Sequence, residues 1–194
     1  MKIKNLLLVA ALMVGAASFT ACGGNKNKQQ KEEIKAEVIT ALNVDSVLSQ
    51  AETLVNTQIT FEGVCTHICA HGGKKIFMMG SDDKNTIRVQ AGKFGAFEKG
   101  CVNSVVRVKG TLKEERIDEA YLQDWETRLK NNTEEKHGNG EGGCDSEKKA
   151  RKETANTPED RIAAFRKQIA ERTEKTGKAY LSFYFVEAES YEIK

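Results

Sequence analysis

Five short segments of the chain alternate apolar with polar residues, and this period of two constrains the fold more than any other feature. Side chains two positions apart lie on one face of a β-strand, so the pattern is typical of strands with one buried face. Glycine pairs and clusters of aspartate and asparagine separate several of these segments, which favours tight turns. We predict strands at residues 58–71, 74–79, 86–91, 102–115 and 178–194.

Three other segments have apolar residues at helical spacing. A short helix is expected at residues 44–55, with Asp45 as its N-cap, and a second helix is expected after Asp118. A third helix is expected to begin at Thr157, which precedes a proline and two acidic residues, and to end at Gly177. The chain is therefore expected to be mainly β with helices added.

Between the second and third helices the composition changes abruptly. Residues 131–157 contain no large apolar side chain, so this segment cannot bury enough surface to join a core. The flanking helices share an apolar stripe, with Tyr121 and Trp125 on one and Phe165 and Ile169 on the other. We expect a helical hairpin whose connection is polar.

The strand pattern resembles the OB-fold, a small, partly open Greek-key barrel of five strands. The segment LSQAETLVNTQITFEGVCTH resembles the entry of anticodon-binding OB domains, and SVVRVKGTLKEE resembles their fourth strand. The resemblance covers residues 43–115 and 178–194, and it implies that residues 116–177 are a helical insertion between strands 4 and 5. The departures from the family are the size of this insertion and the lack of a basic, aromatic binding face.

The first residues of the chain are typical of a targeting signal. Two lysines precede an apolar run at residues 6–17, which is too short to span a membrane. Phe19-Thr20-Ala21-Cys22 resembles the lipobox of bacterial lipoproteins. This resemblance implies that residues 1–21 are removed, that Cys22 is lipidated and that the protein is anchored to a membrane. Ordinary secretion with a chance cysteine is the alternative.

The small, polar residues that follow Cys22 predict a flexible tether, so we divide the mature chain into a tether at 22–42 and a domain at 43–194. The combination resembles OB-like lipoproteins of Bacteroidetes-type bacteria. That resemblance implies a place in the cell envelope, facing the periplasm or the cell surface, and it assigns no activity.

The charge of the chain is balanced once the expected signal peptide is set aside. The formal net charge of +2 comes from 30 Lys and Arg against 28 Asp and Glu, and Lys2 and Lys4 supply the excess. Residues 23–194 therefore carry a net charge of 0. Binding to a nucleic-acid backbone depends on neutralising phosphates, so this balance argues against nucleic acid as a partner.

One segment concentrates residues that carry chemistry. Cys65, His67, Cys69 and His71 alternate along the first predicted strand, where neighbours at i and i+2 are about 7 Å apart on one face. A straight strand can offer two metal ligands, and a bend near residues 69–73 can gather three. Thiolate and imidazole ligands favour Zn or Cu over Mg or Ca. The candidate completing ligands are Cys101, His137 and Cys144.

Two other interpretations of this segment remain open. Its cysteines can pack as small apolar residues while its histidines are solvated. Alternatively, the cysteines form disulfides or exchange thiols, with Cys101 and Cys144 as partners. A bridge from Cys65 to Cys69 is disfavoured, because about 13 Å separates i and i+4 in a straight strand and a disulfide needs Cα atoms less than about 7 Å apart.

No catalytic signature is found elsewhere in the sequence. It contains no Ser-His-Asp set, phosphate loop or dinucleotide fingerprint. We therefore expect a lipid-anchored, non-catalytic OB-like binding module with an unidentified protein or small-molecule ligand, carrying a transition metal on its Cys/His strand. The alternatives are an envelope thiol/disulfide protein and, by analogy with the fold, binding of nucleic acid or oligosaccharide.

Overall fold

The structure is a computed structural model that describes residues 41–70, 72–131 and 144–194. The expected signal peptide, Cys22, His71 and His137 lie outside the described residues. In the part that the structure describes, no helix is long and apolar enough to cross a membrane.

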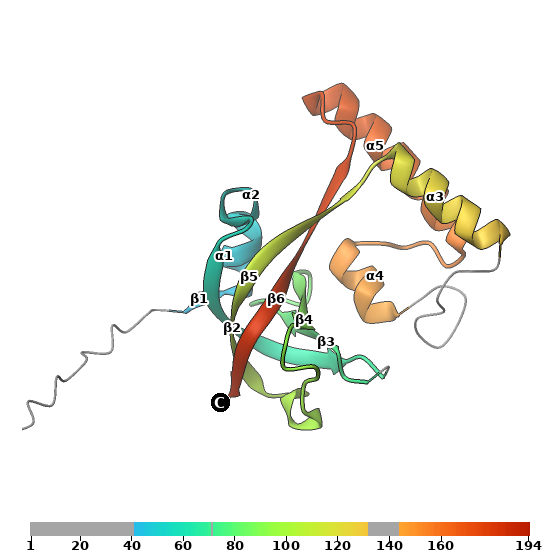
Figure 1. Cartoon of the computed structure of the whole chain (residues 1–194). Helices are drawn as coiled ribbons and strands as arrows, with labels where there is room; N and C mark the ends of the chain where they lie inside the picture. The colour runs from blue at the N-terminus through green and yellow to red at the C-terminus, as the bar shows by residue number, and fades with distance from the viewer. Residues whose placement is uncertain (1–40, 71, 132–143) are drawn as a thin grey trace, which may run out of the picture. The chain divides into compact units, whose positions relative to one another are not determined.

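Strands and helices follow one another along the described chain as in Figure 1. The strands are β1 (Leu42–Asn43), β2 (Gln58–Ile68), β3 (Lys75–Met79), β4 (Thr86–Ala91), β5 (Val105–Ile117) and β6 (Leu181–Ile193). The helices are α1 (Val44–Ser49), α2 (Ala51–Leu54), the 3-10 turn η1 (Lys99–Cys101), α3 (Glu119–Lys130), α4 (Asp145–Arg151) and α5 (Pro158–Thr176).

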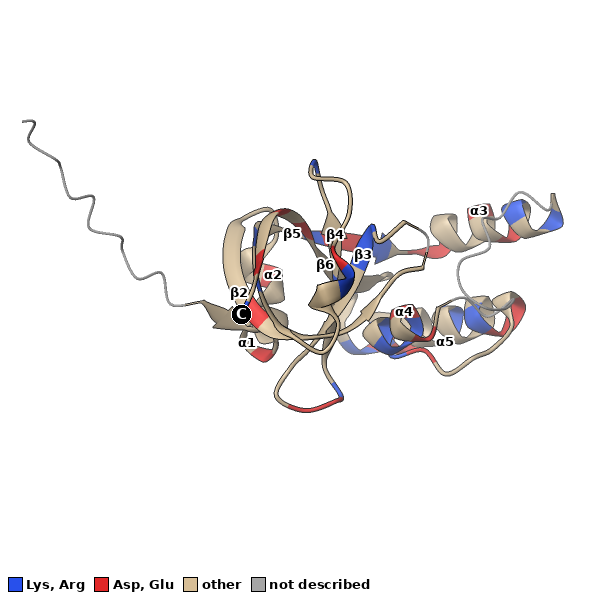
Figure 2. Cartoon of the chain, turned by 90° about the horizontal axis from the view of Figure 1, so that it is seen from below, with Lys and Arg blue, Asp and Glu red and all other residues tan. Residues whose placement is uncertain are grey.

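Five of the strands close into a barrel. The order around it is β2, β3, β4, β6 and β5, and β5 pairs again with β2. The β4–β6 pair is parallel and the other barrel pairs are antiparallel. Figure 2 shows these strands curving around a common centre. The five predicted strands are confirmed, and the closed mixed barrel is consistent with an OB-like fold. The short β1, which pairs parallel with β2, is an unpredicted sixth strand.

The barrel core follows from the alternation along the strands. Side chains that alternate on one face of each strand fill the interior, among them Phe61, Ile76, Met78, Ile87, Val89, Val106, Val108, Leu112 and Val186. A second, smaller core lies where the far ends of β5 and β6 meet α3 and α5. Trp125 and Phe165 are buried there with Tyr121 and Ile169 packed against them, as the shared stripe predicted.

The predicted helix at 44–55 is divided, and its cap differs from the prediction. Asn43, not Asp45, is the N-cap of α1, with its side-chain oxygen accepting from the Ser46 N–H at 2.7 Å. The Asp45 carboxylate instead accepts from the Ser81 N–H at 2.7 Å and from Asn85 Nδ2 at 2.8 Å. Asp45 therefore ties α1 to the turn between β3 and β4.

Helix α4 forms within the segment that was expected to stay out of any core. It has no buried residue, which agrees with the lack of large apolar side chains there. It nevertheless contacts β4 and β3, and it lies beside the barrel in Figure 1. The outer surface of the barrel that α4 covers is the candidate site.

Candidate functional site

A β-bulge in β2 divides the Cys/His segment between two faces of the sheet. Cys65 pairs with Met78 and His67 pairs with Phe77, with the register shifting between them. Consecutive residues of β3 point to opposite faces, and cross-strand partners point to the same face. Cys65 therefore lies in the barrel core while His67 lies outside it, so the expected common face is wrong for this pair. Gly63, which interrupts the alternation of β2, lies where an added Cβ would be 2.7 Å from Val44 Cγ2, so glycine there allows a close approach of α1.

Cys65 and Cys101 are core thiols. Both are fully buried in the barrel, and burial raises the pKa of Cys65 to about 11 and also raises the pKa of Cys101. Because the thiolate is the form that binds metals and attacks disulfides, these two side chains are held in the unreactive form.

Within the part of the chain that the structure describes, the remaining candidate ligands do not form a metal centre. Among the described residues, no group of three or more His, Cys, Asp and Glu side chains could hold a metal ion, and no disulfide joins the four described cysteines. Cys69 lies just after β2 and is partly buried. One pair of candidate ligands does meet, because Cys144 Sγ lies 3.6 Å from His67 Nε2.

The bulge brings His67 into a row of side chains on the outer face of the barrel. His67 pairs with Phe77, Phe77 with Arg88, and Arg88 with Phe185, across β2, β3, β4 and β6. The His67 and Phe77 rings are 5.8 Å apart, and the Arg88 guanidinium lies 4.7 Å from the centre of the Phe185 ring. We call these four residues the outer row.

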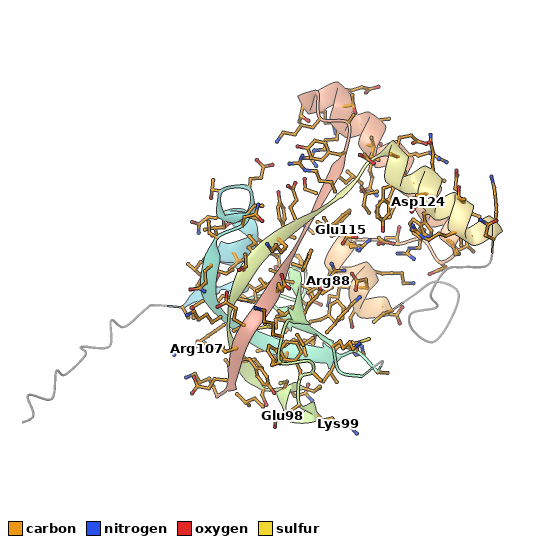
Figure 3. The ribbon with its side chains drawn as sticks, in the orientation of Figure 1. Arg88, Glu98, Lys99, Arg107, Glu115 and Asp124 are labelled. Atoms are coloured by element: carbon orange, nitrogen blue, oxygen red, sulfur yellow. The ribbon has the colours of Figure 1, made fainter. Side chains whose placement is uncertain are left out.

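Helix α4 lies over the outer row and is held by ion pairs. Arg88 binds Glu147 of α4 through one nitrogen and, through the other, Glu115 of β5 at 3.1 Å. Arg151 of α4 binds the same Glu115 oxygen at 2.8 Å, and Lys75 lies 3.8 Å from Glu147. Figure 3 labels Arg88 and Glu115, which face each other near α4. These contacts leave Arg88 only 7% exposed.

The charge balance of this cluster keeps Glu147 ionised. Burial of Glu147 by itself raises its pKa, but the charges of Arg88, Arg151 and Lys75 outweigh burial, so the pKa falls below the ordinary 4.5. Arg88 is not fully satisfied, because its Nε is buried with no hydrogen-bond partner among the described residues. The site therefore presents more donor capacity than α4 uses.

Acid is expected to release α4 from the barrel. Because the folded-state pKa of Glu147 is lowered, its stabilising contribution is complete above 4.5 and is lost as the pH falls through the lowered value. We expect the amide NMR signals of α4 to shift and lose exchange protection below that pH, while those of β4 persist. In Glu147→Gln the α4 signals should be insensitive to the same titration. An equal acid response in that variant would contradict the assignment.

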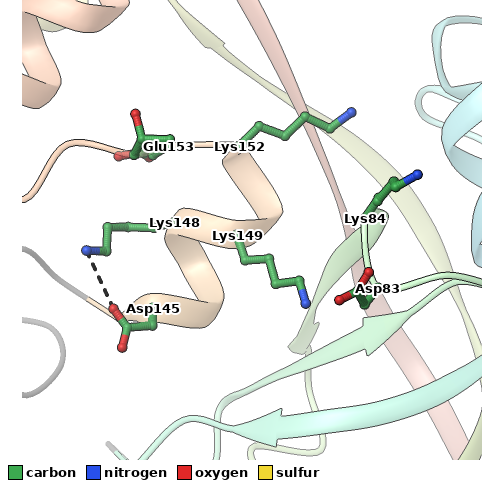
Figure 4. Close-up of a pocket in the computed structure, with 8 residues that line it drawn as sticks. Asp83, Lys84, Asp145, Lys148, Lys149, Lys152 and Glu153 are labelled. Carbon is green, nitrogen blue, oxygen red and sulfur yellow. Dashed lines mark ion pairs between the residues drawn. The ribbon is translucent and has the colours of Figure 1, made fainter.

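On its other side α4 borders a shallow, open hollow, shown in Figure 4. The hollow is lined by Asp83, Lys84, Asp145, Lys148, Lys149, Lys152, Glu153 and Thr154. Lys148 pairs with Asp145 across one turn of α4 at 3.5 Å. The lining residues carry both signs of charge, so α4 is polar on this side as well as toward Arg88.

Comparison with known proteins assigns no family. No protein-family model matches the chain, and no curated protein matches it. One solved structure, described as an aspartyl-tRNA synthetase from Leishmania major Friedlin, matches with 21% identity and a TM-score of 0.29. The match covers 44% of this chain and 18% of that chain, and a likeness of this size supports no statement about function.

Apart from His67, sequence reasoning missed the residues of the outer row and their partner on α4. The alternation at residues 86–91 had already placed Arg88 on the face opposite Ile87 and Val89. The ion pair between Arg88 and Glu147 joins residues 59 positions apart, so no local sequence pattern predicts it.

Proposed function

We propose that this protein is a lipid-anchored, non-catalytic binding module of the cell envelope, whose OB-like barrel binds an acidic ligand on the outer row. The proposal depends on one observation. The Glu147 carboxylate binds Arg88 and lies near Lys75, on a barrel face that also carries Phe77 and Phe185. In OB-folds the face of strands 2 and 3, which correspond to β3 and β4 here, commonly binds the ligand. We further propose that residues 116–177 are an insertion that supplies α4 as a cover for this face.

An acidic ligand can replace α4 at low cost. Helix α4 has no buried residue, so its release exposes little apolar surface of its own. Its hold on the barrel consists largely of charge pairs, and a ligand carboxylate can take the place of Glu147 on Arg88. The buried Arg88 Nε, which lacks a described partner, gives the incoming group a further donor.

The chemistry of the row favours an acidic oligosaccharide. Phe77 and Phe185 flank Arg88 in the row, so a ligand bound to Arg88 lies beside aromatic side chains, and the cationic groups can bind its carboxylate. Sugars with carboxylates combine both features. The balanced charge of residues 23–194 and the expected envelope location make nucleic acid the weaker candidate.

Removing the competing carboxylate should strengthen ligand binding. We expect Glu147→Gln to bind a fluorescent oligogalacturonate about tenfold more tightly than the wild type, because a cover that occupies the site lowers the apparent affinity. The matched control is Asp145→Asn, which removes the same charge from the same helix at a side chain that is 97% exposed. It should bind like the wild type. Fluorescence anisotropy at physiological salt measures both.

Three results would count against the proposal. Equal changes in Glu147→Gln and Asp145→Asn would show a general charge effect. Equal binding of a neutral maltose oligomer would remove the role of the carboxylate. Tighter binding of single-stranded DNA than of oligogalacturonate at physiological salt would favour nucleic acid instead.

A further inference from the structure

Cys144 stands at the junction between α4 and the barrel. It immediately precedes the first residue of α4, and its Sγ lies 3.6 Å from Nε2 of His67 in β2. Both side chains are partly exposed, so a small molecule can reach them. The imidazole of His67 can act as a base that accepts the thiol proton. A cysteine with an adjacent base is a common form of activated nucleophile.

The other described thiols differ from Cys144 in their surroundings. Cys65 and Cys101 are fully buried, and burial raises the pKa of each. Cys69 is partly buried and is the competitor that an experiment must separate from Cys144. Among the described cysteines, none forms a disulfide with Cys144.

We propose that Cys144 is a modification site that exchanges with low-molecular-weight disulfides, with His67 as its base. The Cys144 Sγ attacks one sulfur of the disulfide RSSR, a new Sγ–S bond forms, and the S–S bond of RSSR breaks. The thiol proton passes to His67 Nε2 and then to the departing thiolate, which leaves as RSH. Cys144 is oxidised to a mixed disulfide, half of RSSR is reduced, and no other oxidant is needed.

The modification also bears on the cover of the outer row, and this consequence rests on the proposed function. The group added to Cys144 sits between the start of α4 and His67, where the two elements now touch. Modification removes the contact between Cys144 and His67, and the ion pairs of Glu147 and Arg151 are then the main contacts that hold α4. The modified helix therefore dissociates from Arg88 more readily. Modification of Cys144 thus exposes the binding face.

The first test measures thiol reactivity and does not depend on any ligand. Purified protein in a Cys22→Ser background is treated with dithiodipyridine, a neutral disulfide whose released thione is followed by absorbance. One fast thiol is expected, which is lost in Cys144→Ser and kept in Cys69→Ser. His67→Gln, which keeps a polar side chain but no base, should slow the fast phase about tenfold at pH 7 and less than about twofold at pH 10, where exposed thiols ionise unaided.

Several outcomes would overturn the modification site. Loss of the fast phase in Cys69→Ser would assign the reactive thiol to Cys69. Equal slowing by His67→Gln at both pH values would show that His67 acts on structure and not as a base. A rate that rises after treatment with a chelator would show that Cys144 and His67 hold a metal ion.

The second test separates the modification site from the proposed function. The protein modified with dithiodipyridine is compared with the unmodified protein for binding of oligogalacturonate, with Cys144→Ser as the control that cannot be modified. About fivefold tighter binding after modification, absent in the control, is expected. Fast labelling without any change in binding would leave the modification site standing and overturn its link to the outer row.

Discussion

Replacing Gly110 with alanine is expected to lower the free energy of unfolding by about 3 kcal/mol, the upper part of the range for overpacking. An added Cβ would lie 2.4 Å from the Glu187 carbonyl oxygen and 2.8 Å from Ala188 Cα, both backbone atoms of β6. These atoms cannot move away without opening the β5–β6 pair of the barrel. The gain of up to about 1 kcal/mol from reduced freedom of the unfolded chain offsets only part of this cost.

Gly100→Ala is the matched control for this substitution. The added Cβ at Gly100 would meet only Ile193 Cδ1, at 3.6 Å, which is an ordinary contact. We expect a change within about 0.5 kcal/mol, because neither a clash nor a special backbone conformation is involved. Urea unfolding followed by circular dichroism measures both variants. Equal stability of the two would show that β6 does not depend on the close approach at Gly110.

The strands of the barrel could be predicted from the sequence because the alternation that marks each strand lies within a few consecutive residues. Alternation at residues 86–91 and 74–79 places Ile87, Val89, Ile76 and Met78 on one face, and all four are buried. The bulge between Cys65 and His67 could not be predicted in the same way. A bulge depends on how two strands meet, which the sequence of one strand alone does not determine.

The same distinction explains what was missed at the candidate site. The Cys/His alternation pointed to the right region, but one extra residue in β2 moved His67 to the outer face and left Cys65 in the core. Helix α4 was missed for a different reason. Its hold on the barrel is made of charges, and charge pairs such as Arg88 with Glu147 carry no periodic signal in the sequence.

A helix held largely by charge pairs, with no buried residue of its own, is suited to release. Replacing a buried ion pair by apolar residues is often neutral or stabilising, so the cluster around Arg88 needs a reason beyond stability. Helices α3 and α5 are attached differently, through the second core around Trp125 and Phe165. This contrast predicts that α4 can leave the barrel while α3 and α5 stay in place.

Phe165→Ala is expected to detach α3 and α5 and to leave the barrel folded. Phe165 is 1% exposed, and its ring lies 6.3 Å from that of Trp125 and 5.8 Å from that of Phe183. Loss of such a side chain costs about 3–5 kcal/mol, and among the described residues this second core buries only five. We expect the Trp125 fluorescence to report unfolding at a lower urea concentration than the amide protection of β2 and β3.

The control is Phe94→Ala, an exchange of the same residue type at a side chain that is 36% exposed. Phe94 contacts Phe97 and Tyr191 near the barrel but belongs to neither core, so its loss should cost about 1 kcal/mol or less and shift both probes together. A single transition in Phe165→Ala, with Trp125 and the strands unfolding at the same urea concentration, would contradict the expectation. The two cores would then unfold as one cooperative unit.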